Sequence, residues 1–218
     1  MISLSAKDVV STTAVISYVA FICTGLEVCF KIKRKGNTAG ISVFPFVSCT
    51  VCAVLWLKYA LLLWDLAMLY VNTIAAIFQF SYTLYFYTYT VEKHNVRRVL
   101  IVTAIFLCSV LFYVKYLAVD DETAKFHLGL TCMASSVVSF ASPLASVAEV
   151  MRTQCTECLA FSLCLTNFLV AIQWFIYGMI IKNNFVKVPN MLGSALCLAQ
   201  LFLFVIYPRS KSQTRIEL

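Results

Sequence analysis

A tryptophan, a tyrosine and an asparagine occur twice in this chain with the same spacing. Every member of the second set lies 118 residues after its counterpart: Trp56, Tyr59 and Asn72 match Trp174, Tyr177 and Asn190. The same offset relates further pairs: Arg34 with Arg152, Thr38 with Thr156, and Tyr89 with Tyr207. A constant offset without a gap indicates an internal duplication. The chain is therefore predicted to hold two copies of one structural unit with a spacer between them.

The composition places both copies in a membrane. Of the 218 residues, 61% are hydrophobic and only 12% are charged, and the mean hydropathy is +0.88. Soluble domains are nearer half apolar and about a quarter charged. A globular core this apolar would have too few polar residues to cover it. We therefore predict an integral membrane protein.

Seven apolar stretches are long enough to cross a bilayer, for which a helix needs about 20 residues. Because lipid offers the backbone no hydrogen-bond partners and the stretches are longer than barrel strands, they are predicted to be helices. The fold class expected is an all-α membrane protein with seven transmembrane helices. The predicted spans are Val9–Phe30, Ile41–Leu63, Ala67–Tyr89, Val99–Ala118, Phe126–Ala148, Leu159–Ile181 and Val186–Tyr207.

The loop charges predict the orientation of these spans. One side receives 11 of the 17 basic residues: Lys31, Lys33, Arg34, Lys35, Lys93, Arg97, Arg98, Arg152, Arg209, Lys211 and Arg215. Short loops rich in Lys and Arg stay on the cytoplasmic side. The N-terminus is therefore expected outside and the C-terminus inside. The net charge of +7 follows from this bias and calls for no nucleic-acid partner.

The number of spans explains the spacer. Each copy holds three spans, so copies joined directly would point in opposite directions across the bilayer. One extra helix, Val99–Ala118, lets both copies run the same way, as two parallel three-helix repeats joined by a linker helix. The expected division is a first repeat at 1–90, a linker region at 91–125, a second repeat at 126–207 and a cytoplasmic tail at 208–218.

Ionisable residues are nearly absent from the spans. No Asp, Glu or His is placed at mid-membrane, where a proton relay or a cation site would need one. The spans also lack a nucleophile–base pair or a metal-binding cluster, so neither an enzyme nor a cofactor is expected. Sodium bound by backbone carbonyls alone is left open. The cysteines are expected to be free thiols, and packing is favoured over zinc or redox chemistry for Cys49-x-x-Cys52 and Cys155-x-x-Cys158.

The polar groups expected at mid-membrane are neutral and paired. Trp56 and Asn72 each lie eight residues from Trp64, and Trp174 and Asn190 each lie eight residues from Lys182. At 1.5 Å per residue, all four lie at most about 12 Å below the helix ends. Two amides and two flat indoles at one level suit a neutral polyol such as a sugar. The alternative is that they serve as interfacial anchors and helix–helix hydrogen bonds.

Helix-breaking residues add possible hinges. Pro45 lies early in the second span and Pro143 lies in the fifth, and the 118-residue offset places Gly25 opposite Pro143. Pro189, beside Asn190, could bend the last span. Proline removes a backbone hydrogen bond and glycine bends easily, so such points serve either as hinges or as static kinks.

Together these residues resemble the SWEET family of sugar facilitators. The resemblance rests on Ala141-Ser142-Pro143-Leu144, Trp174-x-x-Tyr177-Gly178, Pro189-Asn190-x-x-Gly193 and Val71-Asn72, in that seven-span order. It implies that Trp56, Asn72, Trp174 and Asn190 bind a sugar. Phe21, Cys52 and Ser139 join the expected substrate-binding set. It also implies passive alternating access for mono- or disaccharides, an oligomer, and a plasma membrane or endomembrane location such as the Golgi.

Several positions depart from the family pattern. Gly25 and Ala160 stand where the family has helix prolines, so the expected hinge set is Gly25, Pro45, Pro143 and Ala160. Asn183 replaces an acidic residue of the last hairpin. The bulk of Phe21 favours a monosaccharide over a disaccharide.

The function predicted is a passive hexose uniporter. Two alternatives stay open: a proton-coupled carrier of another small solute, and a seven-span receptor with the same topology.

Overall fold

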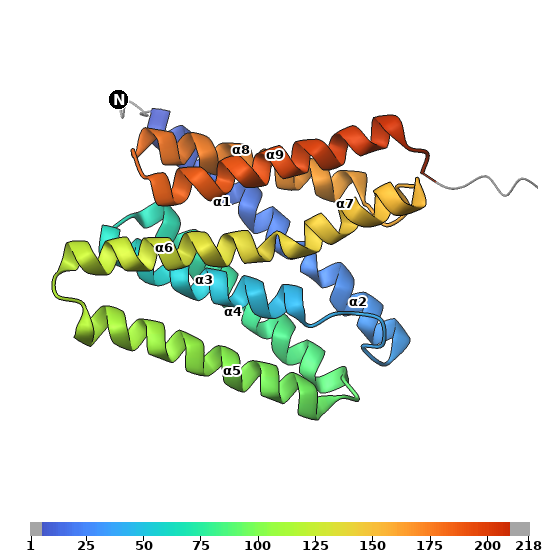
Figure 1. Ribbon diagram of the computed structural model, residues 1–218, viewed down its shortest axis with the longest axis horizontal. Coiled ribbons are helices and arrows are strands. Elements are labelled where there is room, and N and C mark those ends of the chain that lie inside the picture. Colours follow the sequence, from blue (N-terminus) through green and yellow to red (C-terminus); the bar gives the residue numbers. More distant parts are fainter. Residues whose placement is uncertain (1–5, 210–218) are drawn as a thin grey trace, which may run out of the picture.

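The computed structural model describes residues 6–209, and all the regular secondary structure over that range is helical (Figure 1). Lys211, Arg215 and most of the predicted cytoplasmic tail lie outside the described residues. The helices are α1 (Ala6–Cys23), α2 (Gly25–Lys35), α3 (Phe44–Leu63), α4 (Leu66–Tyr89), α5 (Lys93–Phe112) with a π-helical turn at Tyr113–Leu117, α6 (Asp121–Ser139), α7 (Ala141–Thr153), α8 (Phe161–Ile180) and α9 (Asn184–Ile206).

Seven segments of the described chain are long and apolar enough to cross a membrane, which confirms the predicted number of spans. The first consists of α1 and α2 and the fifth of α6 and α7. The main difference from the predicted bounds is at helix ends that carry charge. The fourth span begins at Lys93 rather than Val99, and the fifth at Asp121 rather than Phe126. Hydropathy locates the apolar part of a helix, and charged turns continue beyond it.

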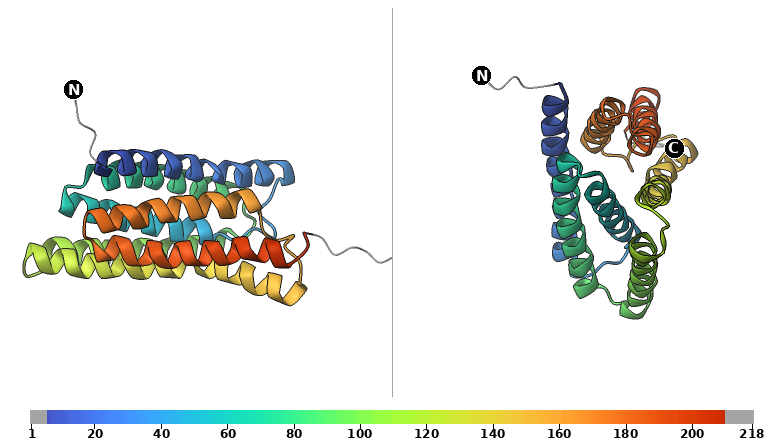
Figure 2. Two further views of the ribbon diagram at one scale, coloured as in Figure 1. Left: turned by 90° about the horizontal axis from the view of Figure 1, so that it is seen from above. Right: turned by 90° about the vertical axis from the view of Figure 1, so that its left-hand side faces the viewer.

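The helices form two three-helix bundles with equivalent internal packing (Figure 2). In the first bundle α4 packs against α1 and α3, and in the second α9 packs against α6 and α8. The bundles meet through two equivalent contacts, α1 with α8 and α3 with α6. Helices α1 and α6 begin at the same end of the molecule (Figure 1). The predicted fold of two parallel repeats is thus present, while the boundaries at residues 90 and 125 stay a prediction.

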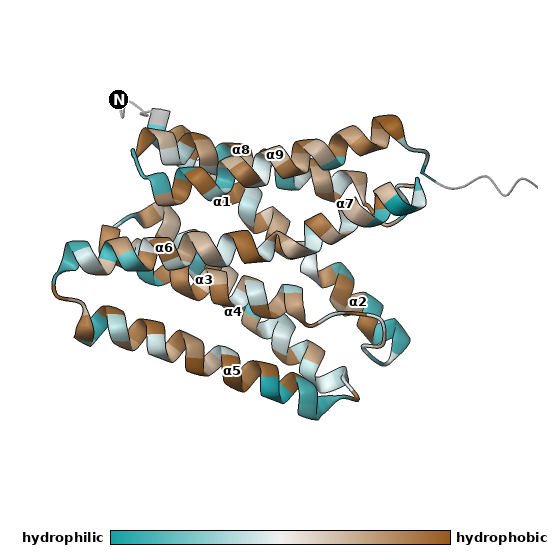
Figure 3. Cartoon of the chain, viewed as in Figure 1, coloured by the Kyte–Doolittle hydropathy of each residue, from teal (hydrophilic) through white to brown (hydrophobic). Residues whose placement is uncertain are grey.

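Helix α5 joins the bundles and packs on α3. Only 6% of its most apolar 18-residue stretch is buried inside the molecule, and beyond its first turns most of its residues are hydrophobic (Figure 3). A helix with apolar residues on its exposed faces is suited to lipid. The linker therefore returns the chain across the bilayer without entering either bundle.

The two hairpins, α3–α4 and α8–α9, turn in the same way. Trp64 and Lys182 both adopt a left-handed backbone conformation with φ of 53°. The next residue caps the following helix in each case, Asp65 on α4 and Asn183 on α9. Asp65 accepts a bond from the Met68 amide at 3.0 Å, and Asn183 accepts from two amides of α9. We call this end of the molecule the hairpin end.

The opposite end carries basic residues and is called the basic end. Helix α2 finishes with Lys33, Arg34 and Lys35, and the last turn of α7 carries Arg152. Helix α5 begins there with Lys93. Hydrophilic residues gather on α2 and at the start of α5 at this end (Figure 3). The positive-inside prediction assigns the basic end to the cytoplasm.

The first helix of each bundle is broken near its middle. The break between α1 and α2 lies at Thr24, and the break between α6 and α7 lies at Phe140. Pro143 accounts for the second break, since its nitrogen has no hydrogen to donate. No proline lies at the first break. There, a Cβ atom on Gly25 would lie 2.4 Å from the ring of Tyr82, so close packing requires glycine at this position.

Candidate functional site

A cavity of about 540 Å³ lies between the two bundles. Its volume falls in the range of small-molecule sites, roughly 300–1,000 Å³. The lining includes every residue predicted to bind substrate: Phe21, Cys52, Trp56, Asn72, Ser139, Trp174 and Asn190. Among the predicted hinges, Pro45, Pro143 and Ala160 line it, whereas Gly25 does not. Residues from both halves of the sequence thus meet around one space.

The two amides of the cavity have the same geometry. Asn72 Nδ2 donates to the carbonyl oxygen of Met68 at 2.8 Å, and Asn190 Nδ2 donates to that of Val186 at 2.8 Å. Each bond reaches back one turn along the same helix and holds the side chain in place. An amide has two N–H donors and one carbonyl oxygen. Each side chain therefore keeps one donor and its oxygen for a ligand.

The two indoles have matching ring contacts. Trp56 packs edge-on against Tyr59 with centroids 5.6 Å apart, and Trp174 packs edge-on against Tyr177 at 5.4 Å. Their polar contacts differ. Trp56 Nε1 donates to Ser136 Oγ at 3.1 Å, whereas Trp174 Nε1 is buried without an acceptor among the described residues.

The cavity is closed towards the hairpin end. Tyr59 and Tyr177, one helical turn beyond the tryptophans, are 2% and 1% exposed. Each joins the two bundles through a hydrogen bond. Asn183 Nδ2 donates to the Tyr59 hydroxyl at 2.9 Å, and the Tyr177 hydroxyl donates to Asp65 at 2.6 Å. These bonds hold the two hairpins together above the cavity.

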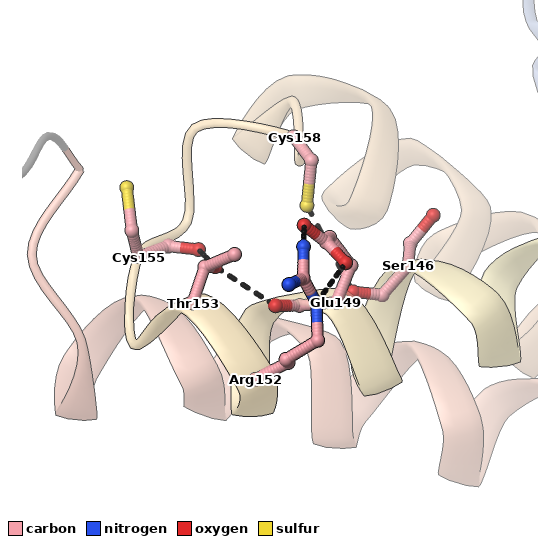
Figure 4. A network of polar contacts seen from close by, with 6 residues as sticks. All are labelled: Ser146, Glu149, Arg152, Thr153, Cys155 and Cys158. Atoms are coloured by element: carbon pink, nitrogen blue, oxygen red, sulfur yellow. Dashed lines mark hydrogen bonds and ion pairs between the residues drawn. The ribbon is translucent and has the colours of Figure 1, made fainter.

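Towards the basic end the lining reaches exposed residues, including Ser142, Cys158 and Ala160. The chain between α7 and α8 contributes Cys158, Leu159 and Ala160 to the lining, and Figure 4 shows the polar contacts around Cys158. There the Cys158 thiol contacts the carbonyl oxygen of Ser146 at 3.8 Å. Nearby on α7, Glu149 and Arg152 form an ion pair of 2.7 Å with largely solvent-exposed side chains. The cavity is therefore open at the basic end.

The predicted hinges differ in their local structure. Pro45 is the second residue of α3. The first N–H groups of a helix have no acceptor within that helix, so a proline there costs no hydrogen bond. Pro45 therefore starts the helix without bending it. Ala160 precedes α8 in an extended conformation. Pro189 lies inside α9 and lines the cavity. The hinge roles of Gly25, Pro45, Pro143 and Ala160 stay predictions.

The polar residues of the lining that were not singled out from the sequence include Tyr18, Ser136, Asn167 and Gln200. Gln200 donates to the carbonyl oxygen of Pro143 at 3.3 Å, beside the α6–α7 break. Its equivalent in the first copy, Tyr82, donates to Ile22 beside the α1–α2 break. A polar residue within an apolar span was the available signal for Asn167 and Gln200.

The described residues hold no group of three His, Cys, Asp or Glu side chains that could bind a metal ion. All ten cysteines are unpaired in the structure. The cavity thus offers neutral hydrogen-bonding groups, thiols and aromatic faces.

The sequence profile of a family described as sugar efflux transporters for intercellular exchange matches this chain twice, over residues 8–94 and 126–212. The chain belongs to this family. Relatives of this SWEET chain include the sugar transporter SWEET1 of Drosophila pseudoobscura pseudoobscura, which is 37% identical over 93% of the chain and 90% of the relative. SWEET1 of Rattus norvegicus is 32% identical over 93% and 92%.

A solved structure described as a eukaryotic SWEET transporter has the same fold. It is 25% identical in sequence and superposes with a TM-score of 0.83, covering 92% of this chain and 98% of the other. Family membership and this structure confirm the predicted resemblance to the SWEET family. They also confirm the predictions that the chain is a multi-pass membrane protein and that it is a transporter rather than an enzyme.

Proposed function

We propose that this SWEET-family chain is a facilitative uniporter that moves a hexose such as glucose in both directions by alternating access. One observation carries the proposal. A neutral cavity lies between the two equivalent bundles, closed at the hairpin end by the Tyr59–Asn183 and Tyr177–Asp65 bonds and open at the basic end.

The lining suits recognition of a sugar. A hexose has hydroxyl groups around its rim and C–H groups on its faces. The indoles of Trp56 and Trp174 offer flat apolar surfaces for those faces. The amides of Asn72 and Asn190 each keep an acceptor and a donor for hydroxyl groups.

The lining also supports uncoupled transport. Among the described residues, those that line the cavity include no Asp, Glu, Lys, Arg or His. Proton-coupled carriers use ionisable groups within the membrane to take up and release the coupling proton. Movement down the sugar gradient needs none, which favours a uniporter over the proton-coupled alternative.

The helix breaks and the closed hairpin end support alternating access. In the structure the cavity is open at the basic end, which we assign to the cytoplasm. In the opposite state the hairpins separate and the chain segments at the basic end close. Bending at Gly25 and Pro143, with Pro45 and Ala160 at the starts of α3 and α8, moves the basic-end halves of the bundles.

Three further features belong to the proposal. The Phe21 ring packs against Tyr18 with centroids 6.0 Å apart, and this aromatic wall narrows the cavity in favour of a monosaccharide. The exposed apolar faces of α5 can pack against other copies in a homo-oligomer. The plasma membrane is the proposed location.

Counterflow of radiolabelled hexoses in proteoliposomes, with and without a proton gradient, tests the proposal. We expect glucose exchange that does not depend on the gradient. The Asn190→Ala variant is expected to lose exchange while it still folds and inserts. Uptake that stops when the gradient is removed, or sucrose that outcompetes glucose, would contradict the hexose uniporter.

A further inference from the structure

A second cavity, of about 330 Å³, lies at the basic end of the first bundle, and we call it the basic-end cavity. Its lining comes from the chain between α2 and α3, from the end of α4 and from the first turns of α5. The described residues that line it are all different from those that line the central cavity. The basic-end cavity is therefore separate from the proposed transport path.

The equivalent place in the second copy is filled by the chain itself. There the backbone N–H and the hydroxyl of Thr156 both donate to the carbonyl oxygen of Pro208, at 3.0 and 3.2 Å. The 118-residue offset relates Thr156 to Thr38 and Pro208 to Thr90. Thr38 and Thr90 both line the basic-end cavity. The contact that closes this position in the second copy is thus open in the first.

Thr38 consequently keeps two unused donors. It lines the cavity and is only 8% exposed, and neither its backbone N–H nor its hydroxyl has an acceptor among the described residues. The start of α5 also lines the cavity, and the side chain of its N-cap residue, Glu92, does not cap the helix. The first N–H groups of a helix have no acceptor within it, and they favour an anion. These donors suit a group with several acceptor oxygens, such as a phosphate.

The charges of the two copies differ at this end. The last turns of α2 carry four basic residues, Lys31, Lys33, Arg34 and Lys35. None of the ion pairs that the described residues form includes any of them, whereas Glu149 pairs with Arg152 in the second copy. The 118-residue offset puts Lys31 in the place of Glu149 and Arg34 in that of Arg152. Like charges at this spacing are unfavourable, and a bound anion relieves their repulsion.

One of these cations lies at the edge of the cavity. The Lys35 ammonium donates to the carbonyl oxygen of Ala39, a residue of the lining, at 2.5 Å. The described lining includes one carboxylate, that of Glu92, which accepts a bond from Asn95 Nδ2 at 2.9 Å. Hydrophilic residues of α2 and of the start of α5 gather at this end (Figure 3). Unpaired cations therefore outnumber the acidic group at this cavity.

The cavity also borders an apolar surface of α5. Val99 lines the cavity and is exposed, and Val102 and Phe106 are exposed as well. Residues with spacings of three and seven share one face of a helix. This face is suited to lipid chains, so an amphiphilic phosphate is favoured over a soluble one.

We propose that the basic-end cavity binds the phosphate-bearing headgroup of an anionic phospholipid. Thr38 donates to the phosphate, Lys35 and its neighbours on α2 supply positive charge, and an acyl chain lies along the exposed face of α5. The positive-inside prediction places this end in the cytoplasmic leaflet, which carries anionic lipids. The site belongs to the first copy alone, because Pro208 takes the place of the ligand in the second. This lipid site is separate from transport and assumes no particular solute.

Native mass spectrometry of the full chain in detergent tests the proposal. The probes are phosphatidylinositol bisphosphate, phosphatidylcholine and the soluble inositol phosphate headgroup. We expect a one-to-one complex with the anionic lipid. Its affinity should be about tenfold or more above that for the soluble headgroup, because acyl groups add binding energy. Equal binding of phosphatidylcholine overturns the anion site, and a headgroup that binds as tightly as the lipid overturns the lipid assignment.

Thr38→Val keeps the shape of the side chain and removes its hydroxyl. Since a hydrogen bond to a charged group is lost, we expect affinity for the anionic lipid to fall about tenfold. This hydroxyl has no acceptor among the described residues, so thermal unfolding without added lipid should change little. The matched variant Thr156→Val loses a bond to Pro208 instead and should keep its lipid affinity. Equal affinities in wild-type and Thr38→Val protein, or an equal loss in Thr156→Val, overturn the proposal.

Lys31→Glu tests the charge. It puts a carboxylate three residues before Arg34, as Glu149 stands before Arg152 in the second copy, and should lower lipid affinity about tenfold or more. Lys182→Glu at the hairpin end changes the net charge by the same amount and should leave lipid affinity unchanged. Equal weakening by both substitutions would show attraction to the net charge of the protein rather than a site, and would overturn the proposal.

Discussion

The hydroxyl of Tyr177 donates a 2.6 Å hydrogen bond to Asp65, which lies on the opposite bundle. At the equivalent place the direction is reversed, because Asn183 donates to the Tyr59 hydroxyl at 2.9 Å. Asp65 and Asn183 occupy matching positions in the two copies, and both also cap the next helix. One of the two bonds that close the hairpin end therefore has a carboxylate acceptor and the other is neutral.

Asp65→Asn is expected to weaken this closure. Hydrogen bonds to charged groups contribute about 1.5–3 kcal/mol and neutral ones about 0.5–1.5 kcal/mol, so the loss is roughly 1 kcal/mol. That loss shifts the equilibrium about fivefold towards the state open at the hairpin end. Spin labels at Leu66→Cys and Asn184→Cys, which are equivalent exposed positions, report the separation of the hairpins. Asparagine can still cap α4, so folding should be retained.

Asn183→Asp is the matched variant with the opposite change. It replaces the neutral bond to Tyr59 with one to a carboxylate, and Asp remains a good cap for α9. We expect the spin-label distances to shift towards the closed hairpin end. Equal responses to both substitutions would show that charge at these positions does not set the balance.

Gly178 allows α8 and α9 to approach closely below the second hairpin. A Cβ atom there would lie 2.7 Å from the backbone nitrogen of Lys187, and backbone atoms cannot rotate away. Gly178→Ala should lower the free energy of unfolding by about 1–3 kcal/mol or more. The first copy has Ala60 at the equivalent position, so Ala60→Gly should cost only about 1 kcal/mol. Thermal unfolding of both variants in detergent compares them directly, and equal losses would contradict the packing argument.

The number of helices and their grouping could be predicted because bilayer thickness and backbone hydrogen bonding leave few options for long apolar stretches. A common level for Trp56, Asn72, Trp174 and Asn190 was expected because distance from a hairpin tip converts to depth, and all four line one cavity in the structure. The faces that these side chains present depend on packing between helices, which one sequence does not specify.

The contacts between the copies lay beyond prediction for the same reason. Ser136 is an ordinary serine in an apolar span, and only the packing of α6 on α3 brings it to Trp56. The break at Thr24 was expected only as a possible bend at Gly25. The ring that requires glycine at this position, that of Tyr82 from α4, lies 57 residues away from Gly25 in the chain.

Gly25 and Tyr82 are predicted to be coupled. In Gly25→Ala the new Cβ meets the Tyr82 ring, and such overpacking costs about 1–3 kcal/mol. Tyr82→Leu alone also destabilises, because a buried ring and its bond to Ile22 are lost. The double variant should be more stable than the sum of the single losses, since the smaller side chain leaves room for the methyl group. Thermal unfolding of all four proteins measures this coupling, and additive losses would show that the two residues act independently.

Cys158 should report on the mouth of the cavity at the basic end. Cys158 is an exposed residue and part of the lining. The protein atoms around its thiol remove some of its contact with water, and this desolvation raises the pKa of the thiol above the ordinary value. The thiolate is the reactive form, so labelling is expected to be slow at neutral pH and to accelerate as the pH rises through the alkaline range. A polyethylene glycol maleimide too large for the cavity should label Cys158 from the basic end only and block hexose counterflow. As a control, Cys158→Ser should keep its counterflow after the same treatment. Labelling of Cys158 from the hairpin end would contradict an open mouth at this position. Undiminished counterflow in labelled wild-type protein would contradict it as well.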